Sequence, residues 1–318
     1  MQSERASSFH NGSLSRPARS TVAVVGLGSI GGAVAAFLRY ANRHDLVACV
    51  RIPIERLILD WPEGTIEVPI RTITHATDAT PVDWVLLCTK AHQVESAAPW
   101  LARLCGPRTR IGVLQNGIDH AGRLAPFVKD AIVVPTLVYY NGERLGPDHV
   151  RFRRAGGYDL AVRDDAEGQA LAALLGGTPM RVLLTQGFET LAWQKLLINA
   201  IANPITALTL QRQSVFRRPD IQELCLAILH EAVAVARSNG ARLADDEAER
   251  TLRTLLTYPA EAGTSMYFDR LAGRPFEVEA LTGAIVAASE RCGVPAPLNR
   301  VLLTLLRAAS LGGALLGK

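Results

Sequence analysis

The chain has 318 residues, 48% of them hydrophobic and 20% charged, and this length usually exceeds one hydrophobic core, so two domains are expected. The formal net charge of +4 comes without a block of lysine and arginine interleaved with aromatic residues, which argues against a nucleic-acid-binding protein. The five cysteines lie at least seventeen residues apart and no H-x-x-x-H pair occurs, so no metal site is expected, and the dispersed thiols indicate a cytoplasmic protein.

Neither end of the chain predicts a membrane segment. Residues 1–20 are rich in serine and arginine and contain no apolar run, so we interpret them as a disordered tail rather than a secretory signal. The apolar stretch 301–316 is interrupted by Arg307 and by two glycines, and it is too short to span a bilayer.

Short buried strands alternate with helices from residue 21 onward. Thr21–Val25 is β-branched and apolar without alternation, which is typical of a strand buried on both faces of a parallel sheet. Further strands are expected at Leu46–Val50, Trp84–Thr89, Ile111–Leu114, Ala131–Tyr139, Val150–Arg153 and Leu160–Val162, and helices at Ala33–Tyr40, Val94–Leu104 and Asp165–Leu175. This alternation predicts βαβ units in a doubly wound sheet.

The pattern becomes wholly helical after Gln186. Helices are expected at Glu189–Leu208, Asp220–Ser238, Asp246–Thr257, Glu277–Arg291 and Leu298–Ser310. The sequence therefore predicts an α/β doubly wound domain over residues 21–186 and an all-α domain over residues 187–318.

A glycine-rich loop follows the first strand. Its G-x-G-x-x-G pattern is formed by Gly26, Leu27, Gly28, Ser29, Ile30 and Gly31. Between a buried strand and a helix, such glycines allow a tight turn and close approach of the backbone to a pyrophosphate, which the helix N-terminus attracts. This context predicts a Rossmann-type dinucleotide site; the alternative is a glycine-rich turn that binds nothing.

The residue after the second strand indicates which dinucleotide binds. An NAD enzyme usually has an acidic residue there for the ribose 2′-hydroxyl, whereas this strand ends at Arg51 and Asp45 precedes it. Because a guanidinium pairs well with a 2′-phosphate, we expect NADPH. The alternative is that Arg51 is an ordinary exposed charge.

Polar side chains interrupt the apolar helix at 189–208. Lys195, Asn199 and Asn203 recur every four residues and so share one face. Burying such groups without partners is unfavourable, which indicates a cleft or a polar ligand. The alternative is a polar stripe that faces the other domain across solvent.

Five more residues are candidates for the same site. Ser265 and Asp269 would share a helical face, and Glu277 would begin the next helix. Taken alone, Ser265 and Asp269 are better explained by helix capping, and Glu277 by a first-turn acid that complements a helix dipole. Lys90 and Asn116 each follow a predicted strand, at the end where open α/β sheets bind ligands; a solvated lysine and an Asn-Gly turn are the alternatives.

These landmarks, in this order, resemble the ketopantoate reductase (2-dehydropantoate 2-reductase) family. The matching stretches are GLGSIGG at 26–32, Arg51, TKAHQ at 89–93, QNG at 115–117, WQKLLINAIANPITAL at 193–208 and TSMYFDRLAGRPFEVEALTG at 264–283. The resemblance implies NADPH-dependent reduction of ketopantoate to pantoate, in pantothenate biosynthesis.

The resemblance also implies roles for individual residues. Lys195 would donate the proton or stabilise the charge on the C2 oxygen, and Glu277 would contact the cofactor ribose and orient the site. Asn199, Asn203 and Ser265, together with Lys195, would bind the substrate. The NADPH contacts implied are the glycine loop (Gly26 to Gly31), Arg51, Lys90, Asn116 and Glu277.

Two positions depart from the family pattern. Ala262 and Gln213 stand where the family usually has substrate-binding asparagines. Reduction of another branched 2-keto acid therefore remains an alternative, as does a non-catalytic NADPH-binding sensor. The expected partner is a small 2-keto acid, and the chain is expected to be a monomer or a homodimer.

Overall fold

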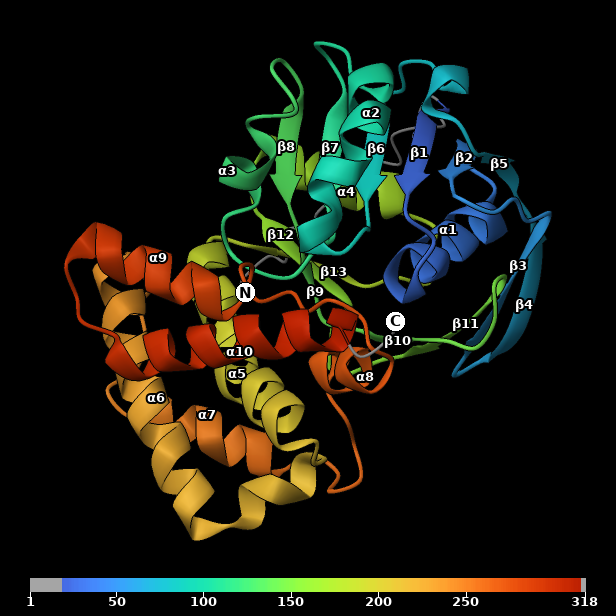
Figure 1. Cartoon of the computed structure of the whole chain (residues 1–318). Coiled ribbons are helices and arrows are strands. Elements are labelled where there is room, and N and C mark those ends of the chain that lie inside the picture. The colour runs from blue at the N-terminus through green and yellow to red at the C-terminus, as the bar shows by residue number, and fades with distance from the viewer. Residues whose placement is uncertain (1–18, 316–318) are drawn as a thin grey trace, which may run out of the picture.

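The computed structural model describes residues 19–315, with side chains described for residues 19–310. Residues 1–18 of the predicted tail therefore lie outside the described residues. Of the two tail residues that are described, Ser20 accepts a hydrogen bond through its carbonyl from the Asp45 amide at 2.9 Å. An α/β domain is followed by an all-helical domain, as predicted (Figure 1). No helix in residues 19–315 is both long and apolar enough to cross a membrane.

A six-stranded sheet forms the centre of the first domain. In spatial order its strands are β5 (Arg71–Ile73), β2 (Asp45–Cys49), β1 (Thr21–Val25), β6 (Trp84–Leu87), β7 (Arg110–Val113) and β8 (Ile132–Pro135), and all neighbours are parallel. The order reverses direction between β1 and β6, which is the switch point where such sheets bind ligands.

Helices cover both faces of this sheet. Alternate residues of β1 belong to different cores: Val22 and Val24 pack in the core that includes α1 and α4, whereas Ala23 and Val25 pack in the core that includes α2 and α3. This confirms the prediction that the strand is buried on both faces. The helices are α1 (Ser29–Ala41), α2 (Val94–Leu104), α3 (His120–Leu124) and α4 (Ala166–Leu175), with short 3-10 turns at Ala76–Asp78 and Ala91–Gln93.

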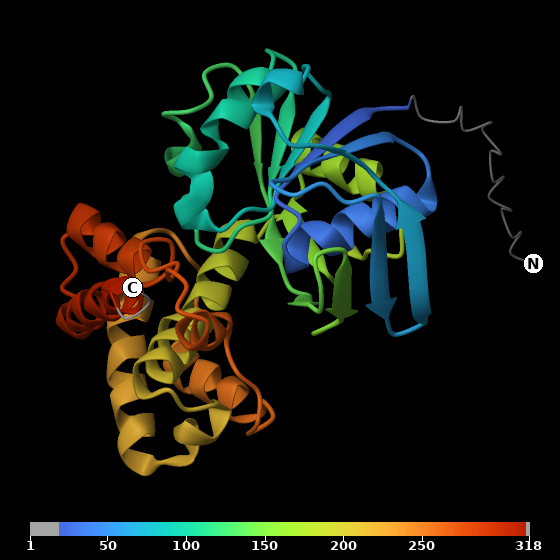
Figure 2. The same cartoon turned by 45° about the vertical axis from the view of Figure 1, so that its right-hand side comes forward.

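Two smaller sheets complete the domain. The first is formed by β10 (Asn141–Arg144), β11 (His149–Arg153), β3 (Arg56–Trp61) and β4 (Gly64–Pro69), and it lies beside α1 (Figure 2). The second is formed by β13 (Val182–Thr185), β12 (Leu160–Arg163) and β9 (Leu137–Val138).

The second of these sheets corrects a prediction. The single strand expected at Ala131–Tyr139 is two strands, because the chain leaves the central sheet after Pro135 and pairs with β12 through Leu137 and Val138.

The second domain consists of helices, and α5 joins it to the sheets (Figure 2). Its helices are α5 (Phe188–Thr209), α6 (Pro219–Ser238), α7 (Glu247–Leu256), α8 (Ser265–Leu271), α9 (Thr282–Cys292) and α10 (Pro297–Leu315), with a 3-10 turn at Gln213–Arg217. Residues of all six helices form one hydrophobic core.

The start of the helix after α8 was predicted wrongly. Glu277 does not begin a helix, since α9 starts at Thr282. Gly273, at a φ of 61°, lies just after α8, and residues 273–281 run without helix toward the first domain. A glycine is favoured at this left-handed position.

Candidate active site

The glycine loop has the backbone that a phosphate site requires. Gly26 has a φ of 94°, and a Cβ on Gly31 would lie 1.9 Å from the carbonyl oxygen of Gly26, so the turn excludes side chains at both positions. A Cβ on Gly28 would meet nothing within 4 Å. Gly26 and Gly31 therefore close the turn, and the backbone at Gly28 stays open to a ligand.

The start of α1 is not capped by any side chain in the described part of the chain. The helix begins at Ser29 rather than at the predicted Ala33, and Gly28, at its N-cap, offers no side-chain acceptor. The first turn, which includes Ser29 and Ile30, contains no acidic residue. Unsatisfied amides and the positive end of the helix dipole make this terminus suitable for a pyrophosphate.

Arg51 lies two residues beyond β2, near the glycine loop. The amide of Gly26 donates to the carbonyl of Cys49 at 3.3 Å, which holds the end of β2 beside the loop. The Arg51 side chain is exposed, with no hydrogen bond or ion pair to any residue in 19–310. Asp45 lies at the opposite end of β2, where it pairs with Arg19. The position suits contact with a 2′-phosphate, and the assignment of Arg51 stays a prediction.

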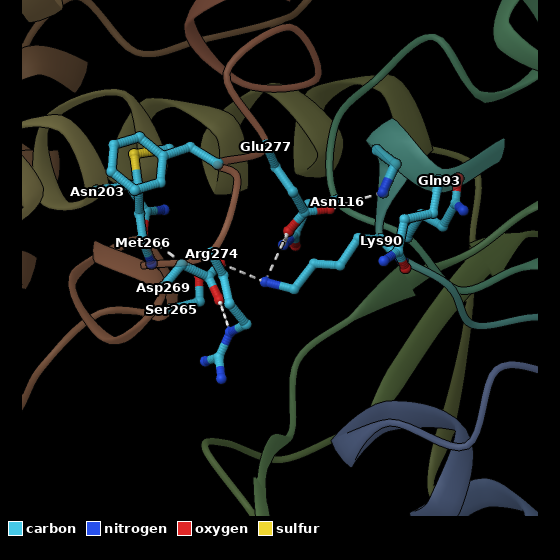
Figure 3. Close-up of polar contacts among 12 residues, drawn as sticks. Lys90, Gln93, Asn116, Asn203, Ser265, Met266, Asp269, Arg274 and Glu277 are labelled. Atoms are coloured by element: carbon cyan, nitrogen blue, oxygen red, sulfur yellow. Dashed lines mark hydrogen bonds and ion pairs between the residues drawn. The ribbon is translucent and has the colours of Figure 1, made fainter. Parts of the chain in front are cut away.

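Glu277 connects the helical domain to the ends of β6 and β7. It is 6% exposed. Its Oε1 accepts from the Ala91 amide at 2.9 Å, and its Oε2 accepts from Asn116 Nδ2 at 3.2 Å, with Lys90 Nζ at 3.7 Å (Figure 3). Three groups from the C-terminal ends of two strands thus meet one buried carboxylate from the other domain.

Lys195 lies against the same group of residues. Its Nζ donates to the Val138 carbonyl at 2.5 Å and to Asn116 Oδ1 at 3.4 Å, and it lies 5.6 Å from the centre of the Tyr139 ring. Burial lowers the pKa of Lys195 to about 8, against an opposing effect of the Glu277 carboxylate. A lysine with this pKa can exchange a proton near neutral pH.

The remaining polar residues of α5 continue from Lys195 toward α8. Asn203 Nδ2 donates to Asn199 Oδ1 at 3.1 Å, and Asn203 Oδ1 accepts from Ser265 Oγ at 3.4 Å and from the Met266 amide at 3.3 Å. Asn203 is buried, whereas Asn199 and Lys195 are half-buried. The predicted stripe on α5 therefore meets Ser265, and the structure brings the two sequence clusters together.

Sequence reasoning missed the residues that support Asn116. His120 Nε2 lies 2.9 Å from the Gln115 carbonyl, and Arg123 Nη2 donates to the Asn116 carbonyl at 3.1 Å. Burial lowers the pKa of His120 to about 3, so this imidazole is neutral, and burial also lowers the pKa of Arg123. Both residues lie in or beside a five-residue helix that no periodic pattern indicated.

Comparison with known proteins gives a consistent family. Residues 22–164 match the family described as "Ketopantoate reductase PanE/ApbA", and residues 187–310 match "Ketopantoate reductase PanE/ApbA C terminal". The 2-dehydropantoate 2-reductase of Caulobacter vibrioides is 35% identical over 294 residues, covering 92% of this chain and 99% of the relative. The enzyme of the same name from Mycobacterium tuberculosis is 37% identical, with coverage of 92% and 98%.

Solved structures share the whole architecture. A dimeric ketopantoate reductase from Staphylococcus aureus superposes with a TM-score of 0.81 at 26% identity, covering 92% of this chain and 99% of the other. A PanE/ApbA family ketopantoate reductase from Ralstonia eutropha gives 0.83 at 27% identity, with the same coverage. Both similarities extend over the two domains.

Proposed function

The chain belongs to the ketopantoate reductase family, and we propose that it catalyses the NADPH-dependent reduction of 2-dehydropantoate to pantoate, a step of pantothenate biosynthesis. The observation that carries this proposal is the environment of Lys195: a lysine of pKa about 8 that contacts Asn116, which in turn contacts the buried Glu277. Next to it, Asn199, Asn203 and Ser265 form a hydrogen-bonded series suited to a small polar substrate.

The glycine loop and the strand ends fit a nicotinamide dinucleotide. The open backbone at Gly28 and the uncapped first turn of α1 would hold the pyrophosphate. Lys90, Asn116 and Glu277 would contact the part of the cofactor nearer the reaction, and Arg51 would select NADPH through the 2′-phosphate. When bound, the reduced cofactor supplies a hydride to C2 of the keto acid.

Lys195 would complete the reduction by moving a proton. As C2 gains the hydride, the ketone oxygen becomes an alkoxide, and a nearby ammonium stabilises this charge strongly in a site shielded from water. Transfer of one proton from Lys195 Nζ to that oxygen gives the alcohol. At neutral pH a lysine of pKa about 8 is still mostly protonated, and it is more acidic than an ordinary lysine.

Glu277 would act by orienting the site. Its two oxygens accept from the Ala91 amide and from Asn116, so the amide oxygen of Asn116 is left facing Lys195. Its charge also raises the pKa of Lys195, which opposes the effect of burial and keeps the ammonium form populated. Contact with the cofactor ribose is part of the same proposal.

The substrate would bind along α5 and the start of α8. Ser265 would lie near the carboxylate of the keto acid, and Asn199 and Asn203 would bind its polar groups. Asn199, Asn203 and Ser265 hydrogen-bond to one another through hydroxyl and amide groups, and these bonds could be exchanged for bonds to substrate.

The direct test is the oxidation of NADPH, followed by nicotinamide absorbance, with 2-dehydropantoate as substrate and NADH as the control. Fast turnover with NADPH alone would support both the reaction and the role of Arg51. No turnover with 2-dehydropantoate would exclude the proposed substrate.

A second candidate substrate is another branched 2-keto acid. The two positions that depart from the family pattern are neighbours, because the backbone N–H of Gln213 donates to the backbone carbonyl of Ala262 at 3.0 Å. Gln213 is 7% exposed, and its Oε1 has no hydrogen-bond partner among the described residues. A changed pair of side chains here would alter recognition of the substrate tail rather than the reacting carbonyl. Comparison of kcat/KM over several 2-keto acids separates the two candidates.

The family membership argues against a non-catalytic NADPH sensor, since the matched relatives are named as reductases. The oligomeric state is proposed as monomer or homodimer, and sedimentation at several protein concentrations distinguishes these two states.

A further inference from the structure

The carboxylate of Asp269 joins the two domains beside the active site. Asp269 lies in α8 and is 3% exposed. Its Oδ2 accepts from Lys90 Nζ at 2.6 Å, and its Oδ1 accepts from Arg274 Nε at 3.0 Å. Figure 3 shows the two cations reaching the carboxylate from different sides. A buried carboxylate needs such partners, so Asp269 fixes both of these side chains.

Lys90 is left with two N–H groups that are not hydrogen-bonded to these carboxylates. An ammonium group has three donors. Asp269 takes one of them, and Glu277 Oε2 lies 3.7 Å from the same nitrogen on another side. The carboxylates are 4% and 6% exposed, whereas the Lys90 side chain is 36% exposed. Lys90 is thus held from the helical domain, and its side chain remains partly exposed.

We propose that Asp269 is a positioning residue for cofactor binding: it holds the Lys90 ammonium in place so that another of its N–H groups meets an oxygen of the nicotinamide cofactor. The inference rests on the proposed function only in that the cofactor binds at these strand ends. A free lysine would have to lose the rotamer freedom of its long side chain when the cofactor arrives. Because Asp269 has already fixed that side chain, binding avoids much of this entropy loss.

Arg274 makes the proposal testable by substitution. When Lys90 is replaced by methionine, Asp269 keeps Arg274 as a partner, so the carboxylate is not left unpaired. When Asp269 is replaced by asparagine, the shape of the side chain is retained and only the charge is lost. The two variants and their combination therefore form a double-mutant cycle.

The experiment measures the Kd of NADPH by fluorescence of the bound nicotinamide in the wild type, Asp269→Asn, Lys90→Met and the double variant. We expect Asp269→Asn to weaken binding about tenfold and Lys90→Met at least as much. In the double variant we expect no further loss beyond about twofold, because Asp269 acts through Lys90. Unchanged binding in either single variant, or fully additive losses, would overturn the proposal.

Glu279→Gln is the matched control. Glu279 lies two residues beyond Glu277 and pairs with Arg307 at the surface, with 65% of its side chain exposed. The same change from carboxylate to amide should leave the Kd unchanged there, and an equal loss would mean that general charge, not Lys90, sets the affinity. If Asp269→Asn does not fold, Asp269→Glu takes its place in the cycle, because it keeps the charge but moves the carboxylate by one methylene group. The assay needs no turnover, so its result is independent of whether 2-dehydropantoate is the substrate.

Discussion

Replacing Lys195 by methionine is expected to remove most of the turnover and, at neutral pH, to make the folded protein more stable. Methionine retains much of the length of the side chain but has no ammonium. Without the proton donor and the charge that stabilises the alkoxide, kcat should fall by two orders of magnitude or more. The Kd of NADPH should change little, because Lys195 contacts Val138 and Asn116 rather than the glycine loop.

The stability change follows from the pKa of Lys195. Burial lowers this pKa from 10.5 to about 8, so between these values the unfolded chain binds a proton that the folded chain does not. Folding therefore becomes more favourable as the pH rises through this window, and below pH 8 the full cost of burying the charge applies. That cost is at most about 3 to 4 kcal/mol, and solvent at this half-buried site reduces it.

Two measurements check this reasoning. Steady-state NADPH oxidation gives kcat, and in the wild type kcat should decline above pH 8 as the ammonium is lost. Urea unfolding at pH 7 and pH 10 gives the stabilities, and the gap between variant and wild type should narrow at the higher pH. Turnover within a few-fold of the wild type would remove Lys195 from the mechanism. A variant that is less stable than the wild type at pH 7 would show that burial of the ammonium is not destabilising.

Three further predictions concern the cofactor site and its support. Arg51→Ala should weaken NADPH binding much more than NADH binding, as measured by titration; equal weakening would mean that Arg51 does not read the 2′-phosphate. Gly28→Ala should lower cofactor affinity with little change in Tm, whereas Gly31→Ala should lower Tm markedly, because its Cβ would lie 1.9 Å from the Gly26 carbonyl oxygen; similar Tm values for the two would contradict this account. His120, with a pKa of about 3, must stay neutral in the fold, so the free energy of unfolding of the wild type should fall as the pH drops below about 6.5. In His120→Gln the pH dependence of this free energy should be weaker by the equivalent of up to one bound proton. An unchanged pH dependence would show that His120 is not responsible.

Local patterns were sufficient for most of the central sheet and for the helical domain. β1 and α2 have the predicted limits, because uniformly apolar strands and amphipathic helices are encoded by neighbouring residues. The stripe of Lys195, Asn199 and Asn203 could be found in the same way, since a helix places every fourth residue on one face. The sequence therefore indicated the fold class and the residues that fill the proposed site.

The four-stranded sheet beside α1 was not predicted, although a strand was expected within β11. Its strand β11 lies next to β3, although about ninety residues separate them in the chain. Such a pairing depends on contacts that no local window contains, and β10 in particular has no apolar alternation. For the same reason the split between β8 and β9 could not be read from one β-branched run.

In the active site, the sequence and the tertiary structure determined different features. The sequence determined which side chains are available, because residue type and spacing fix their chemistry and their face on a helix. The tertiary structure decided that Glu277 belongs to an extended segment and meets the Ala91 amide, and that Asp269 pairs with Lys90 across the two domains. Burial and charge pairing between distant segments stabilise these contacts, and neither can be calculated before the segments are brought together.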